Sequence, residues 1–336
     1  MTRILSICSN DINADIYSYM DLLNHRRETK YFFSDGTIGE IKNKLEEPKL
    51  KGDKAVGCCG IENINYICYI GFTIVYDGII DVKYFKNVSN PLVSIQRLID
   101  LSNDNFFGIY ISDREIYAFK DRTGSLPGMF GIGENRNIVI CSENIGFIKT
   151  DDIFGGEILH IKDKIITRNV NIRNVKPNIY EFLFYAKSES DIYGLNVGEF
   201  RHDLSSLLVN KLDKHFDAIF SISEESRIYG LTIANILKIP YMEPKKISND
   251  KFISKINMYK FEDNHFSYDN ILVIDKNITT DEIPDLFIKS LKCKNKNDIT
   301  FLSLLPNKEM VELGYDIIYN TDENLKNISG FQEISY

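Results

Sequence analysis

The chain has 336 residues, of which 43% are hydrophobic and 26% are charged. This composition can bury a substantial core, which excludes a disordered chain, a small disulfide scaffold and a fibrous repeat. Forty lysines and arginines stand against 48 aspartates and glutamates, for a net charge of −8, so nucleic acid is not the expected partner. At ~100 to 200 residues per domain, the length predicts two domains.

The first ten residues and the cysteines indicate the compartment. The start of the chain lacks the basic and apolar regions of a secretory signal, and no apolar stretch approaches the ~20 residues that span a bilayer. We therefore expect a cytoplasmic protein with no membrane partner. The six cysteines show neither CxxC pairs nor histidines at zinc spacing, which favours buried free thiols and no metal site.

Short β-type runs separated by turns fill the sequence up to about residue 170. The runs cover residues 66–78, 106–119, 137–143 and 155–168. Polar connections of hairpin length interrupt the second and fourth runs, at 112–115 and 162–164. With a helix expected around residues 16–24, this half is predicted to be strand-rich with few helices.

The pattern changes after residue 176. Apolar residues recur at three- and four-residue spacing between Val197 and Leu212, which predicts a helix. Further strands are expected at 216–222, 270–275 and 299–305, and further helices at 228–238 and 281–291. Strands that alternate with helices indicate a parallel sheet covered on both faces. We therefore predict one domain over residues 1–175 and a second over residues 176–336, with 245–268 as a flexible excursion.

Several short motifs follow one another in an order that resembles a known family. Residues 2–7, Thr-Arg-Ile-Leu-Ser-Ile, stand where that family has Cys-Gly-Ile-x-Gly-Ile after the initiator methionine. Residues 22–27 contain Leu-Asn-His-Arg, similar to the family's Leu-Gln-His-Arg-Gly, and residues 121–127 resemble its Arg-Asp-Pro-x-Gly-x-Arg-Pro. Residues 141–143, Cys-Ser-Glu, look like its Ala-Ser-Glu. The most specific match is 179–188, Ile-Tyr-Glu-Phe-Leu-Phe-Tyr-Ala-Lys-Ser, which resembles Ile-Phe-Glu-x-Val-Tyr-Phe-Ala-Arg-Pro-Asp-Ser.

The family is glutamine phosphoribosylpyrophosphate amidotransferase, which begins purine synthesis. The resemblance runs over nearly the whole chain. It implies an α+β class II glutaminase-like domain of the N-terminal nucleophile type, with αββα layers, followed by an α/β phosphoribosyltransferase-like domain. It also implies self-association, since family members assemble into oligomers.

Class II glutaminases use the first residue of the processed chain as nucleophile and its own α-amine as base. The resemblance places Thr2 in this catalytic position. A hydroxyl has almost no ionised fraction near neutral pH and depends more on its base than a thiol does. We therefore expect Thr2 to be a small residue at the start of an ordinary first strand and not a working nucleophile.

The remainder of the implied glutamine pocket has lost polar groups. His25 and Arg26 match the family, but Gly60 replaces the arginine whose guanidinium pairs with the substrate carboxylate. Asp77 and Gly78 stand where the family has the Asn-Gly of its oxyanion hole. A carboxylate there repels a developing oxyanion, and losing one such donor costs ~3 to 4 kcal/mol of transition-state stabilisation.

The implied phosphoribosyl site is altered in the same direction. The family's Val-Asp-Asp-Ser-Ile-Val-Arg-Gly-Thr-Thr grips a ribose and a phosphate, whereas the run here keeps Asp275 but has Lys276 as its second residue. The loop is about three residues shorter and lacks the glycine that brings the backbone close to phosphate. Thr279 and Thr280 remain as candidate phosphate ligands, although helix N-capping is the simpler role. No cofactor is expected, and Mg²⁺ only if this site works.

These changes favour a degenerate paralogue of the amidotransferase, kept as a structural or regulatory subunit linked to nucleotide metabolism and not as an enzyme. It is expected to form a homo-oligomer or to pair with an active homologue. Two alternatives stay open. One is an active amidophosphoribosyltransferase that uses Thr2, and the other is a nucleotide-sensing protein that binds through its second domain.

Overall fold

The computed structural model describes residues 2–24, 30–60, 64–86, 89–133, 136–144, 149–246, 259–260, 268–276, 298–305, 316–320 and 328. By compactness the chain divides into two units. The first holds the chain up to Glu181 together with Ala186–Val197, and the second holds Phe182–Tyr185 and the described residues from Gly198 onward. After the predicted boundary at residue 175 the chain therefore alternates between the units. It stays in the first unit to Glu181, enters the second at Phe182–Tyr185, and returns to the first at Ala186–Val197.

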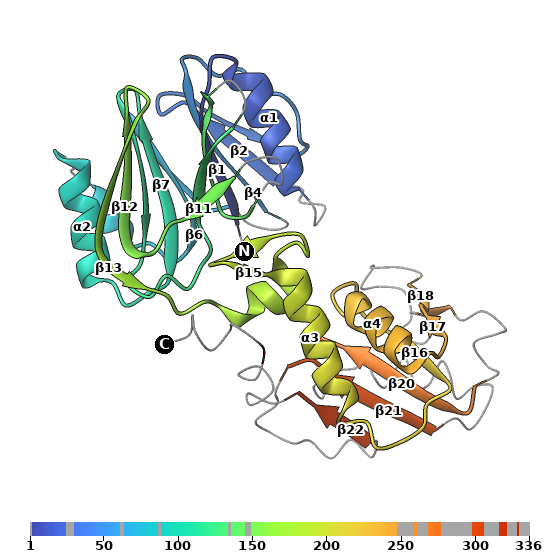
Figure 1. The fold of residues 1–336 in the computed structure, drawn as a ribbon. Coiled ribbons are helices and arrows are strands. Elements are labelled where there is room, and N and C mark those ends of the chain that lie inside the picture. The colour runs from blue at the N-terminus through green and yellow to red at the C-terminus, as the bar shows by residue number, and fades with distance from the viewer. Residues whose placement is uncertain are drawn as a thin grey trace. The chain divides into compact units, whose positions relative to one another are not determined.

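Two antiparallel sheets form the first unit, and β1 lies at the centre of one of them (Figure 1). That sheet has the order β11-β9-β10-β1-β4-β2-β3. Its strands are β1 (Arg3–Cys8), β2 (Lys30–Ser34), β3 (Gly39–Lys42), β4 (Lys54–Gly60), β9 (Met129–Ile132), β10 (Ile138–Cys141) and β11 (Thr150–Asp152).

The other sheet has the order β13-β12-β8-β7-β6-β5. Its strands are β5 (Tyr66–Tyr69), β6 (Phe72–Gly78), β7 (Phe106–Ser112), β8 (Glu115–Lys120), β12 (Gly155–Lys162) and β13 (Ile165–Asn174). The hairpins β7-β8 and β12-β13 turn at the polar connections that the sequence predicted. A β-bulge between Gly155 and Glu157 shifts the register at the start of β12.

Apolar side chains from facing strands fill the space between the two sheets. Alternate residues of β1, β4, β7 and β12 meet there, represented by Ile4, Cys58, Ile109 and Leu159, all buried. This is the arrangement that period-two strands produce when each sheet turns one face to its partner. The core of the first unit therefore ties β1 directly to the second sheet.

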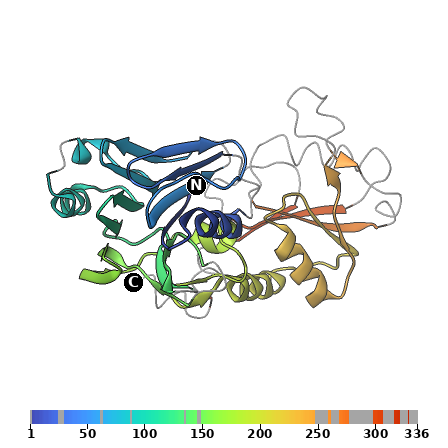
Figure 2. The ribbon, with the colours of Figure 1, turned by 90° about the horizontal axis from the view of Figure 1, so that it is seen from above.

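One helix covers the outer face of each sheet (Figures 1 and 2). Helix α1 (Ile12–Leu23) buries Ile12, Ile16 and Met20 against the sheet of β1, at the four-residue spacing that aligns side chains on one face. Helix α2 (Pro91–Leu101) buries Ile95, Leu98 and Ile99 against the other sheet, after the short 3₁₀ helix η1 (Val82–Phe85). The layers are helix, sheet, sheet, helix.

Along the sequence, several short elements follow the last strand of the sandwich. These are a π-helical turn (Glu181–Tyr185), the two-residue strands β14 (Asp191–Ile192) and β15 (Leu195–Asn196), and helix α3 (Val197–Val209). Helix α3 buries Val197, Phe200, Leu204 and Leu208, which confirms the predicted apolar face. The periodic spacing thus identified this helix correctly from the sequence.

The second unit contains a parallel sheet with the order β17-β16-β20-β21-β22. Its strands are β16 (Ala218–Ser221), β17 (Tyr241–Met242), β20 (Asn270–Asp275), β21 (Asp298–Ser303) and β22 (Asp316–Tyr319). Figures 1 and 2 show α3 and α4 (Arg227–Leu237) on the same face of this sheet. The helix predicted over 281–291 lies outside the described residues.

Two expectations need qualification. In the excursion 245–268, β18 (Lys245–Lys246) pairs with β19 (Tyr259–Lys260), so a short ladder joins its two ends. Cys8, Cys58, Cys59 and Cys141 are buried and free, but Cys68 is exposed. Cys68 follows the buried Ile67 on β5, and successive strand residues point to opposite faces, so its exposure follows from its position.

No helix within the described ranges is long and apolar enough to cross a membrane.

The contact between the two sheets supplies a stability test. Replacing the fully buried Ile109 with Ala leaves a cavity between the sheets, so the free energy of unfolding should fall by ~2 to 5 kcal/mol. Ile165→Ala, at a side chain that is 67% exposed, should change it by less than ~0.5 kcal/mol. Urea unfolding of both variants measures the difference, and equal losses would contradict the assigned core.

Candidate functional site

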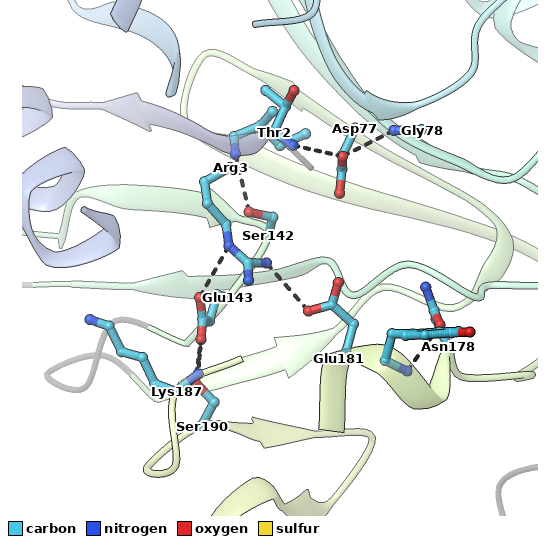
Figure 3. Close-up of polar contacts among 12 residues, drawn as sticks. Thr2, Arg3, Asp77, Gly78, Ser142, Glu143, Asn178, Glu181, Lys187 and Ser190 are labelled. Carbon is cyan, nitrogen blue, oxygen red and sulfur yellow. Dashed lines mark hydrogen bonds and ion pairs between the residues drawn. The ribbon is translucent and has the colours of Figure 1, made fainter. Parts of the chain in front are cut away.

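The start of β1 meets the end of β6 across the sandwich. Thr2, which is 2% exposed, donates its backbone N–H to Oδ1 of Asp77 at 2.9 Å (Figure 3). The same oxygen accepts the N–H of Gly78 at 3.1 Å. Thr2 and Asp77, which the sequence placed in one site, are therefore in direct contact.

Gly78 has a backbone conformation that a larger residue cannot adopt. Its φ is +85°, and a Cβ atom there would lie 2.1 Å from the carbonyl oxygen of Asn105. The predicted Asp-Gly pair is thus held in a fixed turn at the end of β6.

Asp77 is a buried acid whose pKa is shifted from its ordinary value. Burial raises its pKa, and this effect outweighs the opposing influence of the Thr2 N–H and of the Arg3 guanidinium. The carboxyl group is 4% exposed. Asp77 therefore offers acceptor oxygens to Thr2 where a carboxamide would also offer N–H donors.

Arg3 is buried beside this pair, and its guanidinium faces two carboxylates. Its Nε lies 3.4 Å from Oε2 of Glu143, and its Nη1 lies 3.5 Å from Oε2 of Glu181 (Figure 3). The three side chains are at most 2% exposed. Burial disfavours the charge of Arg3, but Glu143, Glu181 and Asp77 raise its pKa above the ordinary value, so it stays charged.

Glu143 also holds the chain that follows the π-helical turn. Its Oε1 accepts the backbone N–H of Lys187 and the hydroxyl of Ser190, the latter at 3.1 Å. The adjacent Ser142 accepts the N–H of Ile4 at 3.1 Å through its Oγ. The network therefore joins β1, the end of β10 and residues 181–190.

This network was not predicted from the sequence. Glu143 and Glu181 lie in motifs that resemble the family, and that resemblance implies no role for them or for Arg3. The available signal was Arg3 itself, a charged residue within an apolar strand where the family motif has glycine.

The structure describes only some of the other residues expected in the pocket. His25 and Arg26 are outside the described residues. Gly60 ends β4 and pairs with Lys30 of β2, and it has no side chain to bind a carboxylate. Asn90, which aligns near a family aspartate, is exposed and caps α2 by accepting the N–H of Val93 at 3.4 Å.

The motif at 121–127 forms a turn held by Asp121. Its Oδ1 accepts the N–H groups of Thr123, at 2.7 Å, and Gly124, at 3.1 Å. The preceding Lys120 is fully buried, and its Nζ donates to the carbonyl of Ile153 at 2.9 Å and to the hydroxyl of Tyr193. Burial lowers the pKa of Lys120 to about 8, although nearby carboxylates oppose this.

In the second unit, Asp275 lies at the carboxyl end of β20, the edge where parallel sheets place ligand sites. Burial raises its pKa, while hydrogen bonds from Ser223 and from the N–H of Lys276 oppose the rise. The Lys276 ammonium lies 5.1 Å from the ring centre of Phe184 and 5.2 Å from that of Tyr185. Thr279 and Thr280 are outside the described residues.

The described residues at this edge differ in charge from the family motif. Lys276 places a cation next to Asp275 where that motif has a second carboxylate. The turn before α4 adds the exposed Glu224 and Glu225. Negative charge near a helix N-terminus opposes an anion there.

The chain is similar in sequence to several curated amidophosphoribosyltransferases. The amidophosphoribosyltransferase of Saccharomyces cerevisiae is 22% identical over 265 residues, covering 66% of this chain and 51% of that protein. That of Escherichia coli is 24% identical over 237 residues, covering 61% and 45%. The chain thus matches about half the length of these curated relatives. No family model matches it.

A solved structure shares the fold over nearly the whole chain. The solved structure of glutamine phosphoribosylpyrophosphate amidotransferase from B. subtilis, complexed with ADP and GMP, superimposes with a TM-score of 0.72. The alignment covers 96% of this chain and 91% of that one at 15% identity. The chain is a divergent relative of the amidophosphoribosyltransferases.

Against the amidophosphoribosyltransferase motifs, three site positions differ in charge. Arg3 replaces glycine, Asp77 replaces asparagine, and Lys276 replaces aspartate. Each new charge has a defined environment, since Arg3 pairs with glutamates, Asp77 with Thr2, and Lys276 lies over two aromatic rings. Each of the three charged side chains therefore has a partner in the structure.

The buried Lys120 gives a pH-dependent prediction. Its pKa is about 8 in the folded protein against an ordinary 10.5, so between these values the unfolded chain binds more protons and the unfolding free energy rises with pH. Lys120→Met removes this contribution. The unfolding free energy of the wild type minus that of the variant should thus increase by ~1 to 3 kcal/mol from pH 8 to pH 10.

Urea unfolding at several pH values measures this difference. Lys162→Met, at an exposed lysine on the same sheet, should track the wild type at every pH. A Lys120→Met difference that is flat or falls with pH would contradict the assigned burial of the ammonium.

Proposed function

We propose that the chain is an amidophosphoribosyltransferase-like protein in which both catalytic sites have lost essential groups, and that it serves as a structural or regulatory subunit in nucleotide metabolism. Its first unit is then a class II glutaminase-like domain, and its second a phosphoribosyltransferase-like domain. One observation carries the proposal: the buried carboxylate of Asp77 lies 2.9 Å from the backbone nitrogen of Thr2.

This contact opposes each step of glutamine hydrolysis. If Thr2 became the first residue, its α-amine would pair with Asp77, and the pair would keep the amine protonated and unable to act as a base. A carboxylate beside the nucleophile also disfavours a developing oxyanion. The neutral form of Asp77 still uses its Oδ1 to accept the N–H groups of Thr2 and Gly78.

The second unit supports the same conclusion by independent chemistry. A phosphoribosyl donor needs carboxylates for its ribose and N–H groups or cations for its phosphates. The edge around Asp275 offers one acid, a lysine held against Phe184 and Tyr185, and the acidic turn at Glu224 and Glu225. The altered charges at both sites support a role that requires the fold without catalysis.

The partner is proposed to be a second copy of the chain or an active homologue. Affinity capture from the native cell, followed by mass spectrometry and native mass measurement of the complex, addresses this. Recovery of an amidophosphoribosyltransferase or of homo-oligomers would support the subunit role. A chain recovered alone and monomeric would contradict it.

Glutamine hydrolysis tests the first site. A chain made to begin at Thr2 should release glutamate from glutamine no faster than a Thr2→Ala control, because Asp77 holds the α-amine as ammonium. Coupled detection of glutamate measures the rate, and mass spectrometry verifies the first residue. Turnover that is abolished by Thr2→Ala would overturn the proposal in favour of an active enzyme.

Ligand binding tests the second site. Phosphoribosylpyrophosphate with Mg²⁺ should leave the melting temperature unchanged, since a ligand that binds the folded state raises it. Nucleoside monophosphates and diphosphates form the parallel series. A saturable shift with a nucleotide alone, lost in Asp275→Asn, would instead favour a nucleotide sensor.

A further inference from the structure

Three ionisable side chains meet in the interior of the first unit beside β1. Arg3 is 2% exposed, Glu143 is fully buried, and Glu181 is 1% exposed. They come from the start of β1, the residues after β10, and the first residue of the π-helical turn. Distant parts of the sequence thus contribute one buried ionic cluster.

Such a cluster is stable only while its charges are matched. Moving a carboxylate out of water costs several kcal/mol, and removing one partner of a buried pair leaves the other uncompensated. The Arg3 guanidinium uses two different N–H edges, Nε toward Glu143 and Nη1 toward Glu181. A planar ion with several fixed donors suits this geometry better than a compact ammonium does.

The carboxylates also position the backbone that follows. Glu143 accepts the N–H of Lys187 and the hydroxyl of Ser190, and the carbonyl of Glu181 accepts the N–H of Ala186 at 2.9 Å. Ser190 in turn accepts the N–H of Val197 through its carbonyl at 2.9 Å. The position of Glu143 therefore helps to fix the backbone of residues 186–197.

We propose that Glu143 and Glu181 form a buried binding site for a guanidinium-type cation, which Arg3 occupies from within the chain. The occupied site holds Glu143 in the position that orders residues 186–190. Arg3 is a positioning residue in this arrangement. The inference is independent of whether either catalytic site works.

Removing the Arg3 side chain while keeping the carboxylates tests the site. In Arg3→Ala, the backbone amides of residues 186–190 should exchange with deuterium at least ~10-fold faster, because local opening becomes easier. Free guanidinium at ~10 mM, far below denaturing concentrations, should restore slow exchange and raise the melting temperature. Sodium and tetramethylammonium at equal ionic strength should do neither.

Matched variants separate this site from general effects of salt. Arg114→Ala, at an exposed arginine paired with Asp113, should show neither the faster exchange nor a response to guanidinium. Arg3→Ala combined with Glu143→Gln and Glu181→Gln removes the negative charge, so its exchange should not respond to guanidinium. Unchanged exchange in Arg3→Ala, or equal rescue by all three cations, would overturn the proposal.

A conservative variant covers the case in which Arg3→Ala does not fold. Arg3→Lys keeps the charge but has only a point-like ammonium, so it should fold and exchange faster at residues 186–190 than the wild type does. Exchange equal to wild type in Arg3→Lys would show that the guanidinium geometry is irrelevant and would also overturn the proposal.

Discussion

A guanidinium enclosed by carboxylates fixes the part of the molecule on which the candidate site depends. Arg3 begins the central strand β1 and contacts Glu143 and Glu181, and the preceding residue, Thr2, bonds to Asp77. Because these groups have little access to water, their charges must balance locally. Substitution of one of these charged residues alone would therefore leave the others without a matching charge.

Each half differs in charge from the motifs of the related enzymes. Beside Thr2, Asp77 replaces an amide, and at the end of β20 Lys276 follows Asp275 where the family has a second acid. The first change adds a negative charge, and the second replaces a negative charge with a positive one. Both are accommodated by new contacts, with Thr2 for Asp77 and with aromatic rings for Lys276. The fold has been retained while its polar interior was rebuilt.

The sequence was informative where periodicity and motif order sufficed. Alternating runs predicted the hairpins β7-β8 and β12-β13, and three- and four-residue spacing predicted α3. The resemblance implied that Thr2 and Asp77 belong to one pocket, and the structure adds the hydrogen bond between them. The Arg3 cluster could not be predicted in this way, because its members are 38 to 178 residues apart and no local pattern marks a buried ion pair. Helix α2 was not predicted, although Ile95, Leu98 and Ile99 recur at three- and four-residue spacing.

The interleaving of the two units has a consequence for how the protein can be divided. Residues beyond 175 return to the first unit, where the N–H of Lys176 bonds to Thr123, that of Asn178 to Ser125, and the Tyr193 hydroxyl to Gly124. A fragment cut at residue 175 would lose these bonds and would leave Arg3 without Glu181. The first unit therefore includes chain that lies beyond its last long strand, as far as Val197.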